Sequence, residues 1–275
     1  MEKTMRIREA AQRWNITERR VSALCKEGKI KGARKQGRVW LIPADTPKPG
    51  DGRVKSGIYK KSTDANRLPL PIGISDYRLA SSEYYYIDKT LMLRDFIDER
   101  PMVSLFTRPR RFGKTLNMDM IRTFFEKTEE DTSVYFKDKK IWECGEKYRN
   151  YQGKYPVIFL SLKNAEGLNF DTAKYQMVEL IAREAERFPF LAKDTNLSDR
   201  DREKYRVLTA FADGHYQMSD DVLYGSLQTF SELLYKHFNQ KTVILIDEYD
   251  VPLDKAFQHG YYREMVALIR AMFGR

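Results

Sequence analysis

The sequence has few of the residues that staple small secreted proteins or hold metal ions. It contains two cysteines, Cys25 and Cys144, and three histidines, and none of them lies at a metal-ligand spacing. This pattern excludes a disulfide framework and is typical of a reducing compartment. No run of about 18 apolar residues occurs, and the N-terminus lacks the long apolar region of a signal peptide. We therefore expect a cytoplasmic protein that is neither secreted nor membrane-spanning.

Negative charge is scarce in the first sixty residues. Of the chain's 49 basic and 39 acidic residues, 16 basic and 6 acidic ones lie in residues 1–60. The rest of the chain carries 33 of each sign, so the whole net charge of +10 belongs to this segment. Such a one-sided excess predicts a polyanionic partner, and we expect DNA. The alternative is a solvated basic tail, which the regular patterning of the segment disfavours.

Apolar residues are also scarce between residues 44 and 67, where proline, glycine and charged residues dominate. This composition is typical of a linker. We therefore predict three parts: a small domain over 1–46, a linker over 47–67 and a larger domain over 68–275.

The small domain has the pattern of two short helices. Apolar residues recur at helical spacing from Ile7 to Trp14 and form one face of a first helix. Thr17 suits the N-cap of a second helix, which Gly28 is placed to end. A sharp turn between the two helices is expected.

A basic hairpin follows the second helix. Gly37 marks its turn, and residues 39–42 form a short strand. Helix, turn, helix and hairpin make a winged helix-turn-helix pattern, in which the second helix enters the DNA major groove and the wing lies along phosphates. The residues TERRVSALCKEGKI and GRVWLIP resemble those of excisionase and MerR-like DNA-binding domains, over about residues 4–46. A small helical protein-interaction module is the alternative. The candidate DNA-binding residues are Arg19, Arg20, Arg34, Lys35 and Arg38.

The larger domain alternates strands with helices. Apolar runs at Met102–Thr107, Pro156–Leu162 and Thr242–Ile246 predict buried parallel strands. Helical patterns lie at about 89–99, 115–127, 171–187 and 222–238. This alternation predicts an α/β fold with a mostly parallel sheet.

A phosphate-binding motif follows the first of these runs. Residues 108–115 read RPRRFGKT, which matches the end of the P-loop pattern but has Arg108 at its first glycine. Backbone N–H groups would wrap a phosphate at the start of the next helix. We expect Lys114 to reach the β- and γ-phosphates and Thr115 to bind Mg²⁺. The candidate nucleotide-binding residues are Arg111, Phe112, Gly113, Lys114 and Thr115. The arginines of this loop either stabilise γ-phosphate charge or form local ion pairs.

An acidic pair ends the last apolar run. Residues 243–248 read VILIDE, the pattern of a Walker B strand. We expect Asp247 to hold Mg²⁺ and Glu248 to orient and polarise the attacking water. A buried strand that happens to end in surface acids is the alternative, and the P-loop motif upstream disfavours it. The two motifs in this order predict a P-loop ATPase that converts ATP and water to ADP and phosphate.

The motifs together resemble those of a known family. RPRRFGKT, YPVIFLSLKN and VILIDEYDVPL, preceded by LPIGISDYR and YYYIDKT, are similar to the predicted AAA-ATPase-like family of bacteria and archaea. The resemblance covers about residues 68–275 and implies an AAA-like P-loop ATPase of the additional-strand type, with ATP and Mg²⁺ as ligands. In that family an arginine replaces the first P-loop glycine. Its members often continue into a restriction-endonuclease-like nuclease domain, and AAA-like proteins often form rings; this sequence shows neither a nuclease domain nor an oligomer.

One departure from that architecture concerns the strand order. The architecture places a strand with a polar sensor residue between the two Walker strands, and we find no such strand up to Arg275. We therefore expect the larger domain to be incomplete at its C-terminus. The leading hypothesis is an ATPase localised to DNA. The alternatives are a DNA-binding regulator whose degenerate P-loop domain does not hydrolyse ATP, and a fragment of a nuclease-linked defence or mobile-element protein.

Overall fold

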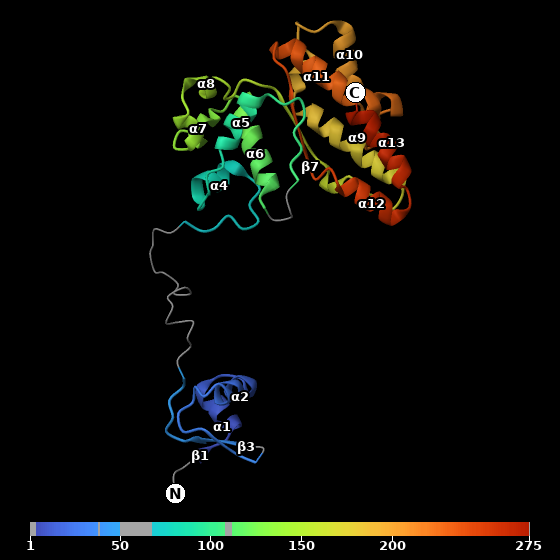
Figure 1. Ribbon diagram of the computed structural model, residues 1–275. Coiled ribbons are helices and arrows are strands. Elements are labelled where there is room, and N and C mark those ends of the chain that lie inside the picture. Colours follow the sequence, from blue (N-terminus) through green and yellow to red (C-terminus); the bar gives the residue numbers. More distant parts are fainter. Residues whose placement is uncertain (1–3, 38, 50–67, 108–111, 275) are drawn as a thin grey trace. The chain divides into compact units, whose positions relative to one another are not determined.

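The chain divides into two compact units, Met1–Asn66 and Arg67–Arg275. The computed structural model, shown in Figure 1, describes residues 4–37, 39–49, 68–107 and 112–274. Each unit has an apolar core of its own. Most of the predicted linker lies outside the described residues.

The N-terminal unit combines two helices with a three-stranded sheet. Its elements are β1 (Thr4–Met5), α1 (Ile7–Trp14), α2 (Glu18–Lys26), β2 (Arg34–Gln36) and β3 (Val39–Pro43). β3 is the central strand and pairs antiparallel with both β1 and β2. The two helices and the hairpin lie where the sequence predicts them. β1 was not predicted, because two residues are too few to show a periodic pattern.

Local signals explain where these helices begin and end. Asn15 follows α1 with a left-handed φ of 51°. The Thr17 hydroxyl then caps α2 by accepting a hydrogen bond of 3.3 Å from the Arg20 N–H. Gly28 follows α2 with a φ of 66°, and its N–H donates to the Cys25 carbonyl. The short helices are thus fixed by their caps and by an apolar core, which contains Ala10, Trp14, Val21, Leu24 and Ile42.

The larger unit is built around a small parallel sheet. β4 (Val157–Ser161) pairs with β7 (Val243–Asp247) in parallel, with Val157 opposite Val243 and Ser161 opposite Asp247. The α/β class expected from the sequence is confirmed. A short antiparallel hairpin joins β5 (Phe211–Ala212) to β6 (His215–Tyr216). The helices are α4 (Tyr77–Glu83), α5 (Leu91–Glu99), α6 (Lys114–Phe125), α7 (Lys140–Glu143), α8 (Glu146–Arg149), α9 (Phe170–Glu186), α10 (Asp199–Leu208), α11 (Asp220–Phe238), α12 (Val251–His259) and α13 (Tyr262–Phe273).

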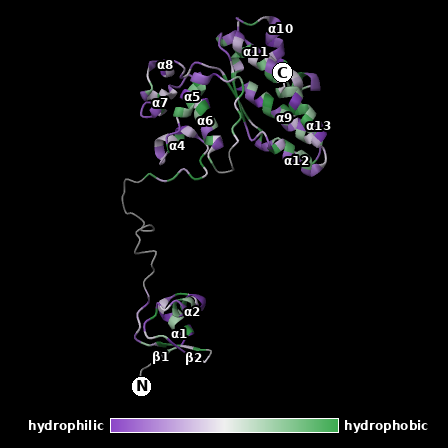
Figure 2. Ribbon diagram, viewed as in Figure 1, coloured by the Kyte–Doolittle hydropathy of each residue, from purple (hydrophilic) through white to green (hydrophobic). Residues whose placement is uncertain are grey.

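Helices cover both faces of this sheet. Successive side chains of a strand point to opposite faces. Ile158 and Leu160 therefore pack into one core with α9 and the helices α10 to α13, whereas Val157 and Leu245 pack into a second core with α4, α5 and α6. Figure 2 shows hydrophobic residues along the sheet and mostly hydrophilic ones on α7 and α10. The result is a three-layer arrangement with α6 on one side and α9 on the other.

The predicted strand at Met102–Thr107 is wrong. These residues belong to no strand, and Val103 and Leu105 are 87% and 67% exposed. Phe106 instead packs edge-on against Phe96 of α5, with ring centroids 5.5 Å apart. An apolar run becomes a strand only when a neighbouring strand supplies hydrogen-bond partners, and the described part of the sheet holds only β4 and β7.

A buried charge network ties α6 to α9 across the edge of the sheet. Arg187, which follows α9, pairs with Glu126 at the end of α6 and with Glu184 of α9, the latter at 2.6 Å. Glu184 also accepts a hydrogen bond of 2.8 Å from the Phe159 N–H of β4, on the side of β4 away from β7. Arg122 of α6 closes the network with a 3.0 Å contact to Glu126. The C-terminal end of α6 is thereby fixed to the sheet.

No helix in the described ranges is long and apolar enough to cross a membrane.

Candidate functional site

The start of α6 has the backbone geometry of an anion site. Gly113 precedes the helix with a φ of 74°, a left-handed conformation that glycine adopts without steric cost. No described side chain caps the helix, so the first N–H groups, beginning at Lys114 and Thr115, have no partner among the described side chains at its positive end. Phe112 is exposed, whereas Lys114 and Thr115 are half-buried. Arg111, with the other arginines of the loop, lies outside the described residues.

Asp247 is the last residue of β7 and is 5% exposed. Val243, Leu245 and Asp247 are alternate residues of β7, and Val243 and Leu245 pack into the α6 core. Its side chain therefore belongs to the face of the sheet that α6 covers. Ser161 stands beside it in register at the end of β4. The sheet thus presents one buried carboxylate, with a neighbouring hydroxyl, towards the layer that contains α6.

Glu248 follows with an unusual backbone. Its φ is 53°, in the left-handed region that side chains other than glycine rarely adopt. Its N–H donates a hydrogen bond of 3.0 Å to Asp247 Oδ1. The turn after β7 therefore holds the Asp247 carboxylate in place, and the Glu248 side chain beside it is half-buried. A strained residue at a strand end is a frequent feature of functional sites.

The helix and the strand that carry the two motifs pack against one another. α6 packs against β7 and β4. Figure 1 shows the start of α6 and the end of β7 at the same, lower end of the larger unit. Gly113, Lys114 and Thr115 thus lie at the end of the sheet where Asp247 and Glu248 emerge. The roles given to these residues by the sequence stay predictions.

Lys89, which was not among the candidates predicted from the sequence, also lies near the start of α6. A Cβ atom built on Gly113 would lie 3.7 Å from Nζ of Lys89. Lys89 belongs to the YYYIDKT segment that leads into α5, and its side chain is exposed. The motif was visible in the sequence, but its proximity to Gly113 depends on how the segment before α5 packs beside α6.

Four of the five candidate DNA-binding residues are described, and they lie at the surface of the N-terminal unit. Arg19 and Arg20 are exposed in the first turn of α2, whereas Val21 and Leu24 of the same helix are buried. Arg34 and Lys35 are exposed in β2. Arg38 lies outside the described residues. The apolar side chains are used in the core, so the outer surface of this unit is mainly polar and basic.

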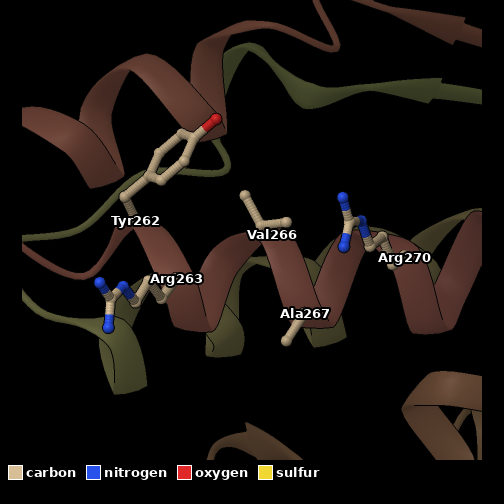
Figure 3. Close-up of a pocket in the computed structure, with 5 residues that line it drawn as sticks. All are labelled: Tyr262, Arg263, Val266, Ala267 and Arg270. Carbon is tan, nitrogen blue, oxygen red and sulfur yellow. The ribbon is translucent and has the colours of Figure 1, made fainter.

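An open hollow runs along α13 in the larger unit. Figure 3 shows Tyr262, Val266 and Arg270 on one side of the helix, at the spacing of successive turns. Arg263 and Ala267 complete the lining. It contains no carboxylate, and it includes no residue of α6 or β7. The hollow therefore contains none of the site residues that the sequence predicts.

Comparison with known protein families identifies the larger unit by its family. A family model described as Predicted AAA-ATPase matches residues 71–275. The chain belongs to this family. Searches of curated proteins and of solved structures return no match. Membership gives the larger unit of this predicted AAA-ATPase a general ATPase-like function, for which a nucleotide ligand is expected.

The residues of the predicted AAA-ATPase unit suit a magnesium ion that arrives with a nucleotide. Among the described residues no group of three or more acidic, histidine or cysteine side chains could hold a metal alone. Mg²⁺ in nucleotide sites needs no such cage, because it takes one or two protein oxygens together with phosphate oxygens and water. A buried carboxylate on Asp247 and a hydroxyl on Thr115 fit that demand.

Proposed function

We propose that residues 68–275 form a P-loop ATPase domain that binds ATP with Mg²⁺ and hydrolyses it to ADP and phosphate. The observation that carries the proposal is the placement of buried Asp247 on the α6 face of the sheet, at the end where α6 begins with an uncapped Gly113-Lys114-Thr115 turn. Helix N-termini bind phosphate through free N–H groups and the helix dipole. A carboxylate at the adjoining strand end supplies the metal ligand.

Each residue has one role in this proposal. The N–H groups at the start of α6 and the Lys114 ammonium hold the β- and γ-phosphates. The Thr115 hydroxyl and Asp247 hold Mg²⁺, which neutralises charge on the phosphates when it is bound. Glu248 accepts a proton from the water that attacks the γ-phosphorus, and the bond from this phosphorus to the bridging oxygen of ADP breaks.

Two substitutions separate binding from hydrolysis. Lys114→Ala removes the ammonium group and should abolish measurable ATP binding in calorimetry. Glu248→Gln keeps the shape of the side chain but removes the base, so it should bind ATP like the wild type and release phosphate at least about 100-fold more slowly. Lys154→Ala, an exposed lysine ahead of β4, serves as the control and should change neither quantity. Unchanged nucleotide affinity in Lys114→Ala would falsify the site.

We also propose that residues 1–46 bind DNA as a winged helix-turn-helix. The support is the exposure of Arg19 and Arg20 on α2 and of Arg34 and Lys35 on the hairpin, together with the concentration of net positive charge in this part of the chain. α2 would enter the major groove and the hairpin would follow phosphates. The larger unit would thereby be localised to DNA.

Charge removal in the full chain tests this second proposal. Replacing Arg34 and Lys35 with alanine should weaken DNA binding and flatten its dependence on salt, because fewer counterions are displaced from phosphates. Lys193→Ala, an exposed lysine of the larger unit, is the matched control. Binding that is equally tight and equally salt-dependent in the double variant, and that survives deletion of residues 1–46, would exclude the helix-turn-helix as the DNA reader.

A second candidate function is a DNA-binding regulator that binds nucleotide without turnover. The unpaired Met102–Thr107 segment favours it, because the described sheet has only two strands and the phosphate loop follows a segment that no strand holds in place. Phosphate release decides between the two, since a wild type that binds ATP and releases no phosphate is the regulator.

A further inference from the structure

Lys89 stands closer to the start of α6 than sequence spacing suggests. Its Nζ atom lies 3.7 Å from the position that a Cβ on Gly113 would occupy. Gly113 is the residue at which the chain turns into α6. The ammonium group is therefore beside the turn whose N–H groups are expected to receive phosphate.

The backbone on both sides of Lys89 is held firmly. Asp88 accepts hydrogen bonds from the Thr90 N–H at 2.8 Å, the Thr90 hydroxyl at 2.7 Å and the Lys140 N–H at 2.8 Å. Burial alone would raise the pKa of Asp88, but these hydrogen bonds outweigh it and hold the pKa below its ordinary value. Thr90 is fully buried, and its hydroxyl accepts a hydrogen bond of 3.1 Å from the Ile141 N–H. The Lys89 side chain thus extends from a fixed base.

Positive charge gathers at this turn without a counterion from the described part of the chain. Neither the Lys89 nor the Lys114 ammonium forms an ion pair with a described carboxylate. The positive end of the α6 dipole adds to the same field. An anion at this turn would interact favourably with the Lys89 ammonium and with the positive end of the helix.

We propose that Lys89 is a second phosphate-binding lysine, which contacts the phosphate chain of the bound nucleotide beside Gly113. This inference rests on the proposed nucleotide site at α6 and adds a ligand to it from outside the P-loop motif. The three residues of the Asp-Lys-Thr triplet then have separate roles, since Asp88 and Thr90 fix the backbone and Lys89 binds phosphate.

Calorimetric titration of the full chain with Mg·ATP tests the proposal. Lys89→Gln should weaken ATP binding about tenfold, the loss expected for one charge-assisted hydrogen bond, and should make the affinity less sensitive to salt. Lys89→Arg keeps the charge and should bind ATP within about twofold of the wild type. Lys154→Gln removes one exposed positive charge elsewhere and should leave the affinity unchanged.

Lys114→Ala distinguishes failure of this inference from failure of the proposed function. ATP binding that is lost in Lys114→Ala but unchanged in Lys89→Gln would overturn the role of Lys89 and leave the nucleotide site standing. A wild type that binds no ATP would overturn both. Melting of the nucleotide-free protein is the second readout: the same melting temperature is expected for Lys89→Gln and wild type, and a large fall would assign Lys89 to folding instead of binding.

Discussion

Glu248 adopts a backbone conformation that glycine would adopt more easily. Its φ of 53° places it in the left-handed region, where the Cβ of an L-residue approaches the following carbonyl. Its N–H donates a hydrogen bond to Asp247 Oδ1 in this turn immediately after β7. A glycine here would relieve the strain but would remove the proposed base. The strain is consistent with a residue kept for its side chain.

Stability measurements can test the backbone requirement at residue 248 separately from the proposed role of its side chain. Because glycine tolerates positive φ and alanine does not, Glu248→Gly should be more stable than Glu248→Ala by about 1 kcal/mol. Urea unfolding of both variants gives the difference. A more stable alanine variant would mean that the turn does not have the positive φ described here.

Some residues of the proposed nucleotide site could be predicted from the sequence and others could not. Gly113, Lys114 and Asp247 were candidates because phosphate and Mg²⁺ binding demand those residue types in that order. Lys89 was not, because its approach to Gly113 is a product of tertiary packing with no characteristic spacing. The face of the sheet to which Asp247 belongs likewise could not be predicted from the sequence alone, because it follows from the observed pairing of β4 and β7.

Among the secondary-structure elements, α10 is a packed helix whose highly charged sequence made its buried face hard to predict. The stretch from 194 to 206 reads as a solvated loop or helix face. The structure has a helix from Asp199 to Leu208, whose Tyr205 and Leu208 are buried. Ser198 and Asp201 form a capping box at its start, and Asp201 also bonds Lys236 of α11 at 2.7 Å. Two apolar residues among so many charges are too few to show periodicity.

This cap predicts a pH dependence of stability. The hydrogen bond from Lys236, followed by that from Ser198, lowers the pKa of Asp201 from 3.8 to about 2. A carboxyl with a depressed pKa stabilises the folded state above its unfolded pKa, and this stabilisation is lost as pH falls from about 4 to about 2. Asp201→Asn should therefore cost about 1 kcal/mol at pH 7, a value reduced by solvent screening of the half-exposed Lys236.

Urea unfolding of wild type and Asp201→Asn across this pH range measures the effect. The difference between the two proteins should shrink as the pH approaches 2. A difference that stays constant with pH would show that the aspartate stabilises α10 without its charge.

Strands were harder to predict than helices, for a physical reason. The runs at Pro156–Leu162 and Thr242–Ile246 became β4 and β7 because each is the hydrogen-bond partner of the other. Met102–Thr107 has an equally apolar sequence but pairs with no described strand. Helix hydrogen bonds are local, so α6, α9 and α11 lie within about two residues of their expected bounds. Strand pairing depends on distant residues.

At the scale of the whole molecule, the chain has two units with separate cores and different surface charge. The apolar cluster around Val21 and Leu24 shares no residue with the clusters around β4 and β7. The net positive charge belongs to the first sixty residues. Unfolding of one unit should therefore leave the core of the other intact.

A core substitution in each unit tests this independence. Leu24→Ala removes buried methyl groups and should destabilise the N-terminal unit by about 2–5 kcal/mol. Met120→Ala should do the same to the larger unit. Thermal unfolding followed by calorimetry should show one transition shifted in each variant. A shift of both transitions by either substitution would contradict independent cores.

The proposed function requires the start of α6 and the end of β7 to hold one nucleotide and its metal together. Calorimetric titration of wild type, Lys114→Ala and Asp247→Asn with ATP, in Mg²⁺ and in EDTA, measures this requirement. Lys114→Ala should lose ATP affinity under both conditions, whereas Asp247→Asn should lose only the gain in affinity that Mg²⁺ provides. An Asp247→Asn variant with the full Mg²⁺-dependent gain would contradict this requirement, because the metal would then be held without the carboxylate at the end of β7.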